Sequence, residues 1–168
     1  MRIFVSICVT LFTFAALAFN SADWHGKREL FAREAERLMA AYTNCLAHLE
    51  SPATDVLVPV ETFEDGTVKL LVSAKKAQYF LDKGLVWAED VVVKKFKKDG
   101  SVGACIEAKN CVVDRFSKSG WAQGLATVTH GKTVLKGTNV YFSSPDGYVK
   151  VFEGADISSE DMKLGGGF

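Results

Sequence analysis

Apolar residues recur every three or four positions from residue 27 to residue 50, which is the spacing of one face of an α-helix. Ser51-Pro52 ends the segment, because proline disfavours helical geometry in the preceding residue and cannot continue the helix itself. The pattern therefore predicts an amphipathic helix over 27–50. Its apolar positions are Phe31, Ala35, Leu38, Tyr42, Cys45 and Leu49.

This predicted helix has two possible roles. It either covers one end of a domain core, or it docks on a membrane surface or a partner. Its charges are mixed, as in Lys27, Arg28, Glu34 and Glu36, and this argues against docking on a membrane. The first role is therefore the better interpretation.

From residue 55 onward, short β-branched and aromatic runs alternate with glycine-containing turns, which is typical of antiparallel β-structure. Apolar residues take every second position in 68–72 and 102–108, so one face of each strand is expected to be dry. The expected turns lie at Asp65-Gly66, Lys83-Gly84, Asp99-Gly100, Ser119-Gly120, His130-Gly131 and Asp146-Gly147.

A weak internal repeat starts at Ala74, Ala108 and Gly137, with a period of about 30 residues. Each unit reads as a strand, a tight turn and a second strand. One hairpin cannot bury its own apolar face, so successive hairpins must stack. The sequence therefore predicts a mainly β protein, an antiparallel roll or jelly-roll of stacked hairpins preceded by one amphipathic helix.

The first residues have the layout of a secretory signal. Met1-Arg2 is positive, residues 3–19 carry no charge, and Ala16-Leu17-Ala18 suits cleavage after Ala18. The alternative is an uncleaved anchor, although the apolar run is short for a membrane span. Export is expected in either case, with anchoring to a membrane if the segment is retained.

Composition limits the remaining possibilities. The 168 residues suit one core, and 48% apolar with 24% charged residues fits neither a disordered chain nor a polytopic membrane protein. Lys plus Arg and Asp plus Glu are 20 each, so no overall positive field favours nucleic acid. The expected organisation is a signal segment 1–18, a helical segment 19–54, a β-domain 55–164 and a flexible tail 165–168.

Cleavage would leave three cysteines, Cys45, Cys105 and Cys111, an odd number that cannot pair fully within one chain. Cys105 and Cys111 could meet only across a turn at 108–110, because six residues of one strand would hold them roughly 20 Å apart. The other interpretation is that all three are small buried side chains. A metal site is disfavoured, since no Cys-x-x-Cys occurs and the histidines are far apart in sequence.

Motifs for catalysis are missing from the sequence. Gly131-Lys132-Thr133 resembles the end of a phosphate-binding loop, but position 126 is Ala where that loop requires Gly. No Gly-x-Ser-x-Gly elbow, His-Glu-x-x-His motif or dinucleotide fingerprint is present. We therefore expect a protein that is not an enzyme and that uses no cofactor.

The segments 135–142, 147–151 and 155–157, with the earlier Ala-x-x-Ala and Asp-Gly units, resemble the OstA-like lipopolysaccharide-transport family (LptA-like and LptC-like proteins) over about residues 56–164. The resemblance implies a twisted roll of two antiparallel sheets whose apolar interior shields lipid acyl chains. It also implies assembly by β-strand addition into a periplasmic bridge. The helix at 27–50 is not part of that pattern.

The leading hypothesis is accordingly a periplasmic protein that binds lipopolysaccharide or a similar lipid and joins other envelope transport proteins, or further copies head to tail, through edge strands. The alternatives are an envelope assembly module without lipid, and an exported hydrolase using residues such as Glu89, Asp114 or His130. The candidates for the lipid-facing interior are Val68, Leu70, Val72, Tyr79, Val91, Val93, Ile106, Val140, Phe142 and Val151.

Overall fold

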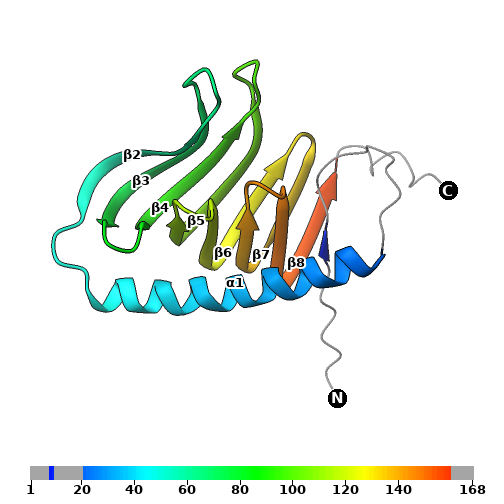
Figure 1. Ribbon diagram of the computed structural model, residues 1–168, viewed down its shortest axis with the longest axis horizontal. Coiled ribbons are helices and arrows are strands. Elements are labelled where there is room, and N and C mark those ends of the chain that lie inside the picture. Colours follow the sequence, from blue (N-terminus) through cyan, green and yellow to red (C-terminus); the bar gives the residue numbers. More distant parts are fainter. Residues whose placement is uncertain (1–7, 10–20, 160–168) are drawn as a thin grey trace.

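The computed structural model describes residues 8–9 and 21–159. Strands β2 to β8 form one antiparallel meander that is not closed, β1 pairs with β8, and one long helix crosses the strands (Figure 1). The elements are β1 (Cys8–Val9), α1 (Ser21–Ala47), β2 (Ala53–Thr62), β3 (Val68–Phe80), β4 (Leu85–Phe96), β5 (Val102–Asp114), β6 (Ser119–His130), β7 (Thr133–Ser143) and β8 (Tyr148–Ser159).

The predicted fold class is confirmed: the protein is mainly β, with antiparallel hairpins after one N-terminal helix. The repeat corresponds to the hairpins β3–β4, β5–β6 and β7–β8. The two sheets implied by the resemblance are instead one continuous sheet. Apart from Cys8 and Val9, the predicted signal segment 1–18 lies outside the described residues, as does the tail 165–168.

The helix differs from the prediction at both ends. It begins at Ser21, before the predicted start. The apolar pattern covers only the part of the helix that packs on the sheet, so it could not predict the turns that precede that part. It ends at Ala47, and the backbone that follows forms hydrogen bonds with the side chain of Gln78 in β3. Gln78 accepts from the Glu50 amide and donates to the His48 carbonyl. The predicted stripe itself is correct, since Phe31, Ala35, Leu38, Tyr42 and Cys45 are buried and Leu49 packs beside them.

The spacing of the buried residues along α1 matches the spacing of the hairpins in the sheet. Phe31 stacks on Tyr148 of the β7–β8 hairpin, with ring centroids 4.2 Å apart. Cys45, two heptads later, lies close enough to the β3–β4 turn for the charges of Lys83 and Asp82 to act on its thiol. Seven helical residues rise about 10.5 Å and two strand spacings are about 9.6 Å, so one heptad of α1 crosses one hairpin.

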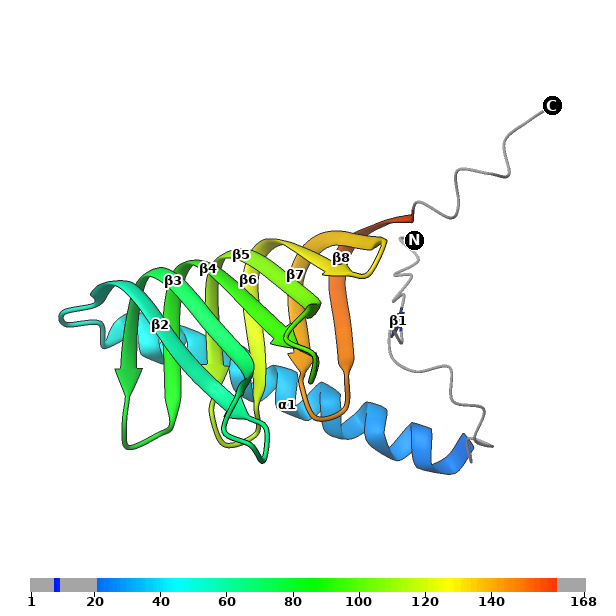
Figure 2. The ribbon, with the colours of Figure 1, turned by 90° about the horizontal axis from the view of Figure 1, so that it is seen from above.

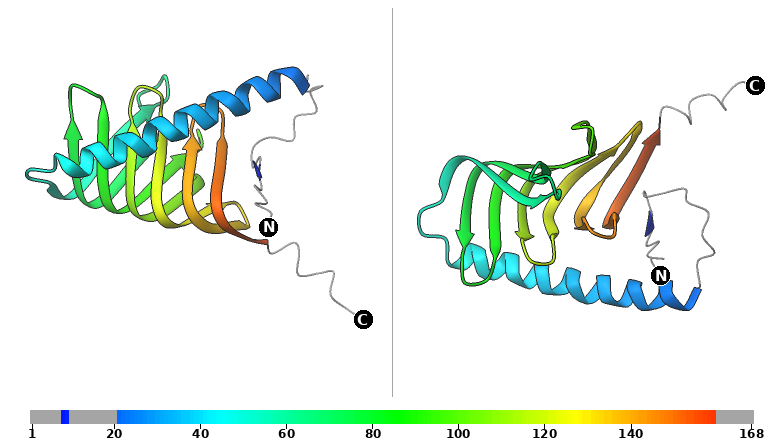
Figure 3. Two further views of the ribbon diagram at one scale, coloured as in Figure 1. Left: turned by 90° about the horizontal axis from the view of Figure 1, so that it is seen from below. Right: turned by 45° about the horizontal axis from the view of Figure 1, so that its top comes forward.

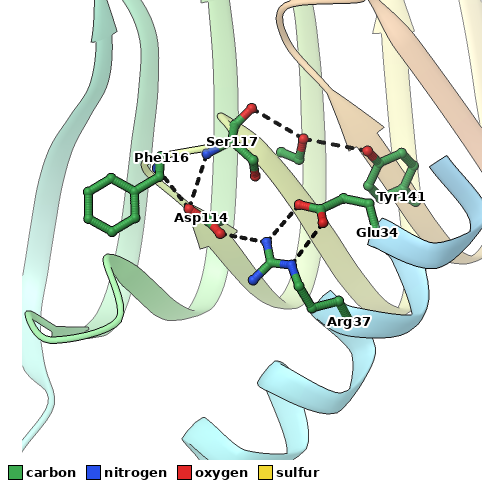
Figure 4. Close-up of polar contacts among 7 residues, drawn as sticks. Glu34, Arg37, Asp114, Phe116, Ser117 and Tyr141 are labelled. Atoms are coloured by element: carbon green, nitrogen blue, oxygen red, sulfur yellow. Dashed lines mark hydrogen bonds and ion pairs between the residues drawn. The ribbon is translucent and has the colours of Figure 1, made fainter. Parts of the chain in front are cut away.

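A polar contact fixes α1 beside the middle hairpin (Figure 4). Arg37 forms a two-point ion pair with Glu34, with a shortest distance of 2.6 Å, and reaches the buried Asp114 of β5 at 2.5 Å. Asp114 Oδ1 in turn accepts from the amides of Phe116 and Ser117 and so orders the β5–β6 turn. The hydrogen bond from Arg37 to Glu34 outweighs burial and raises the pKa of the guanidinium.

Every strand from β3 to β8 bends at one level, which we call the crease. In β4 the interior positions are Val86 and Ala88 before the crease and Val91 and Val93 after it, so the alternation changes phase between them. Figure 2 shows the strands arching. Residues with positive φ stand at this level: Asp55 in β2, Asp90 in β4, Gly124 in β6, Asn139 in β7 and Gly154 in β8.

Irregular pairing accounts for part of the bend. The register shifts by one residue around Gly124 in β6 and around Gly154 in β8, as in β-bulges, which bend a strand and increase its twist. The amide of Gly124 donates to the side-chain oxygen of Asn139 at 2.9 Å, so neighbouring strands are fixed to each other at the crease.

The crease divides the sheet into two arms. The helix-side arm consists of the strand segments between the crease and the turns 81–84, 115–118 and 144–147. The free arm consists of β2 and the remaining segments, which end in the turns 63–67, 97–101 and 131–132. Figure 3 shows α1 running across the strands of the helix-side arm.

One predicted turn is wrong. Ser119-Gly120 lies inside β6, and the chain turns at 115–118, where Lys118 adopts φ 55°. The glycine at 120 is there for another reason: a Cβ would lie 2.2 Å from the ring of Phe142 on the neighbouring strand. Gly120 therefore makes room for an interior aromatic ring.

Packing of α1 is expected to dominate the stability of the helix-side arm. Leu38 is 0% exposed, so Leu38→Ala should lower the free energy of unfolding by about 2–5 kcal/mol through lost burial and the cavity left behind. Met39→Ala is the matched control, because Met39 is 45% exposed and should change that free energy by only about 0.5 kcal/mol. Urea titration measures both; equal losses would contradict this packing.

The Gly120–Phe142 contact gives a second test. Gly120→Ala should lower the free energy of unfolding by about 1–3 kcal/mol, because the added methyl group must displace the Phe142 ring. Gly103→Ala in β5 is the control, since its nearest neighbour is a flexible Lys97 side chain at 3.3 Å. Thermal unfolding of both variants decides, and an unchanged midpoint for Gly120→Ala would refute the steric explanation.

Candidate functional site

The apolar faces of the two arms meet in one continuous buried cluster. Eight of the ten predicted interior residues lie in it: Leu70, Val72, Val91, Val93, Ile106, Val140, Phe142 and Val151. Small residues complete the cluster at positions that the sequence did not single out, among them Ala77, Ala88 and Ala122. The described sheet thus forms an interior between its own halves.

Two of the predicted interior residues lie apart from this cluster. Val68, the first residue of β3, is only partly buried. Tyr79 is 38% exposed, because the pairing of β2 with β3 begins at Ala53–Ala77 and leaves Tyr79 on an edge. Its hydroxyl accepts a hydrogen bond from Arg115 at 2.8 Å, with the guanidinium also over its ring. Tyr79 is therefore an outer residue.

Side chains fill the interior. A cavity of about 40 Å³ remains between the arms, lined by residues that include Val93, Ile106, Val128 and Phe142. This is far below the roughly 300 Å³ at which ligand pockets begin. An acyl chain would fit only if the arms moved apart.

The arms meet at an open seam opposite the crease. Among the described residues no backbone hydrogen bond crosses this seam, because the sheet is not closed. Side chains cross it instead. Ser144 of the helix-side arm donates its hydroxyl to Glu61 at 3.1 Å, and Lys95 of the free arm donates to the Ser144 carbonyl at 2.5 Å. We call Glu61, Lys69, Lys95, Lys118 and Ser144 the seam latch.

Glu61 is the centre of the seam latch. Its carboxylate is 2.7 Å from the ammonium of Lys69 on its own arm and 3.6 Å from that of Lys118 on the other. Burial alone raises the pKa of Glu61, but the hydrogen bonds from Lys69 and Ser144 and the charges of Lys69 and Lys118 outweigh it and lower that pKa. The carboxylate is therefore held ionised between the arms.

Cationic groups concentrate around this carboxylate. Burial, followed by the neighbouring charge of Lys69, lowers the pKa of Lys95. Burial, followed by the charges of Lys97 and Lys95, likewise lowers the pKa of His130, which lies beside the same cavity. The seam thus combines an apolar interior with a mostly positive border.

The side chains proposed for hydrolysis do not converge. Asp114 pairs with Ser119 at one end of the β5–β6 hairpin, and His130 lies at its other end. Glu89 lies at the crease between the lysines 76 and 109. These three groups are therefore at three different levels of the sheet, and the cluster that the hydrolase hypothesis needs is not formed by them.

The cysteines show no pairing in the described part of the chain. Cys105 and Cys111 both lie in the continuous strand β5, so the turn at 108–110 that a disulfide would require is not formed. Cys45 and Cys111 are buried, and burial raises the pKa of Cys111 to about 12. Residues 8–9 and 21–159 also contain no cluster of three or more metal-binding side chains and no helix apolar enough to span a membrane.

The seam latch could not be found from the sequence. Glu61 and Ser144 are 83 positions apart, and Lys95 and Ser144 are 49 apart. A glutamate at the end of a strand and a serine in a turn are ordinary residues at such places. Their proximity follows only from the crease, which brings the ends of the two arms together.

The sequence matches no protein-family model and no curated protein. The resemblance to OstA-like proteins therefore rests on the turn glycines and alternating apolar residues of this chain. What the structure establishes is one helix followed by a seven-strand antiparallel sheet, β2 to β8, that stays open.

Acid should weaken the seam latch. The pKa of Glu61 lies below its ordinary 4.5 in the folded protein, so its stabilisation is present above pH 4.5 and is lost as pH falls through the folded-state value. Glu61→Gln should lower the free energy of unfolding at neutral pH by about 1–3 kcal/mol. The difference from wild type should shrink on acidification.

Urea titrations at neutral pH and at about pH 3 measure this dependence. Glu153→Gln, at an exposed position of β8, is the control and should show neither effect. A Glu61→Gln variant whose stability deficit persists unchanged in acid would contradict the role given to the ionised carboxylate.

Proposed function

We propose that this protein is an exported, non-enzymatic module that shields the acyl chains of a lipid and joins partner proteins through its edge strands. The observation that carries the proposal is the continuous apolar interior between two arms of a sheet that is not closed. Lipopolysaccharide or a similar anionic lipid is the ligand, as the resemblance to OstA-like proteins implies.

Entry of a lipid requires the arms to separate at the seam. Separation breaks the side-chain contacts of Glu61, Lys95 and Ser144 but no backbone ladder, because none joins the arms in the described residues. Acyl chains then take the place of the opposite arm against the apolar side chains. Burial of apolar surface contributes about 25 cal/mol per Å², so this exchange conserves most of the favourable term.

The border of the seam suits an anionic headgroup. Lys69, Lys95 and Lys118 surround Glu61, and His130 lies beside the cavity. When the arms part, Lys118 loses its contact with Glu61 and Lys95 loses its contact with Ser144. Both can instead bind phosphate oxygens, for which lysine is a common partner. The lysines that hold the two arms together would thus hold the headgroup of the bound lipid.

A second candidate is an envelope assembly module that pairs strands with another protein and carries no lipid. The filled interior, with a cavity of about 40 Å³, favours it directly. Both candidates use the unpaired backbone groups of edge strands. They differ in whether the interior ever contacts a hydrocarbon chain.

Site-specific photocrosslinking separates the two candidates. Benzoylphenylalanine in place of the interior Phe142 should form adducts with lipopolysaccharide, and the same group in place of Phe116, which is exposed at the β5–β6 turn, should form none. Because Phe142 packs against Gly120, replacement of Ile106 provides a second interior position. Circular dichroism checks that each variant is folded.

The outcomes are distinct. Lipid adducts at both interior positions support carriage, and Glu61→Gln should increase their rate because it weakens the seam latch. Folded variants that yield no lipid adduct at 142 and 106 would remove the lipid from the proposal and leave the assembly module.

A further inference from the structure

The N-terminal part of α1 extends past the β8 edge of the sheet, as Figure 1 and Figure 3 show. Phe31 is the first buried stripe residue and already lies on Tyr148, the first residue of β8. Residues 21–30, which we call the overhang, add about 15 Å of helix beyond that contact, which equals roughly three strand spacings. Residues 26–30 are all exposed, and Leu30 is 61% exposed.

We propose that the overhang is a docking surface for the outer strands of a different β-sheet protein. The edge strand of that partner pairs with β8, and its first hairpin packs against the overhang of α1. The inference rests on the bridging part of the proposed function and adds which edge is used and what kind of partner fits. It does not depend on whether the interior binds lipid.

The β8 edge is able to accept a strand. The segment Cys8–Val9 pairs antiparallel with it, with Cys8 opposite Lys150 and Val9 opposite Val149. A partner strand that replaces this segment would continue the meander, and its neighbour would lie one spacing further under the overhang. In the sequence, Trp24 stands one heptad before Phe31, the interval at which α1 meets successive hairpins.

The opposite edge is poorly suited to the same pairing. β2 contains Pro59, which has no amide hydrogen, and Asp55 at φ 52°, and its register with β3 shifts on both sides of Glu61. Proline and irregular pairing are features by which edge strands resist strand addition. Beside β3, the hydrogen bonds of Gln78 to residues 48 and 50 hold the α1–β2 connection against the edge.

A second copy of this chain added head to tail is a poor fit for the overhang, because the C-terminal end of α1 lies beside the β2 edge (Figure 1). Its β2 edge would follow β8, and its own helix end and α1–β2 connection would then lie where the overhang of the first copy projects. The partner must therefore present an edge strand whose neighbouring face carries no helix. Lys27, Arg28 and Leu30 are exposed on the overhang. The acidic residue beside them, Glu29, is paired with Arg33 at 3.9 Å. An apolar partner face bordered by carboxylates is therefore complementary.

The test uses photocrosslinking in cells that produce the full-length chain. Benzoylphenylalanine replaces Glu153 on β8 or, as the comparison, the exposed Leu57 on β2. We expect a protein adduct at 153 whose crosslinked peptide maps to an edge strand of a different β-sheet protein, and little at 57. A differently tagged second copy reports self-assembly.

Two matched helix variants test the overhang itself. Leu30→Glu should reduce the adduct at 153 by about fivefold or more, because it places a charge in the proposed contact. Leu46→Glu, on a leucine 49% exposed at the other end of α1, should leave the yield within about twofold. Lipid adducts at Phe142 should not change in either variant, which separates this inference from lipid carriage.

Four results would overturn the inference. These are an adduct between two tagged copies, an equal or stronger protein adduct at 57, no protein adduct at 153, or an unchanged yield at 153 in Leu30→Glu.

Discussion

The structure depends on one constraint: the helix-side arm is apolar on both faces. In Leu85–Ala88 of β4 four consecutive residues are buried, with Leu85 and Trp87 against α1 and Val86 and Ala88 against the interior. Such a strand needs cover on both sides. The helix supplies one cover and the free arm, folded back at the crease, supplies the other. Beyond the crease, in Val91 and Val93, buried residues alternate with more exposed ones because the outer face of the free arm meets solvent.

The interior is therefore closed by packing and by a few polar contacts. A barrel would have to break a hydrogen-bonded ladder to admit a ligand, whereas this sheet has to give up only contacts between side chains at the seam. The partly buried Glu61 favours one closed arrangement, since moving it away from Ser144 and Lys118 leaves its carboxylate with fewer partners. Under the proposed function, the same few residues would set both the stability of the closed form and the access of a lipid to the interior.

Features formed by residues close together in the chain could be predicted from the sequence, and contacts between residues far apart in the chain could not. The helix stripe, the repeat of three hairpins and five of the six predicted turns are correct, because each depends on residues close together in the chain. The prediction of a turn at Ser119-Gly120 was wrong, because Gly120 is needed to make room for the ring of Phe142, 22 positions away. The crease was not predicted, because Asp90 and Asn139 give only a weak signal of positive φ and Gly124 and Gly154 do not lie in the expected turns. The seam latch was not predicted either, because its residues come together only where the crease folds one arm onto the other.

The match between seven helical residues and one hairpin limits how such a protein can change in size. An added hairpin widens the sheet by about 9.6 Å, and the helix covers it only if about one heptad is added as well. Seven residues also return the apolar stripe to the same side of α1. Lengthening by five residues, in contrast, would rotate Phe31 by about 140° away from the sheet. Relatives of this chain should therefore differ in length by coordinated steps, a hairpin together with two helical turns.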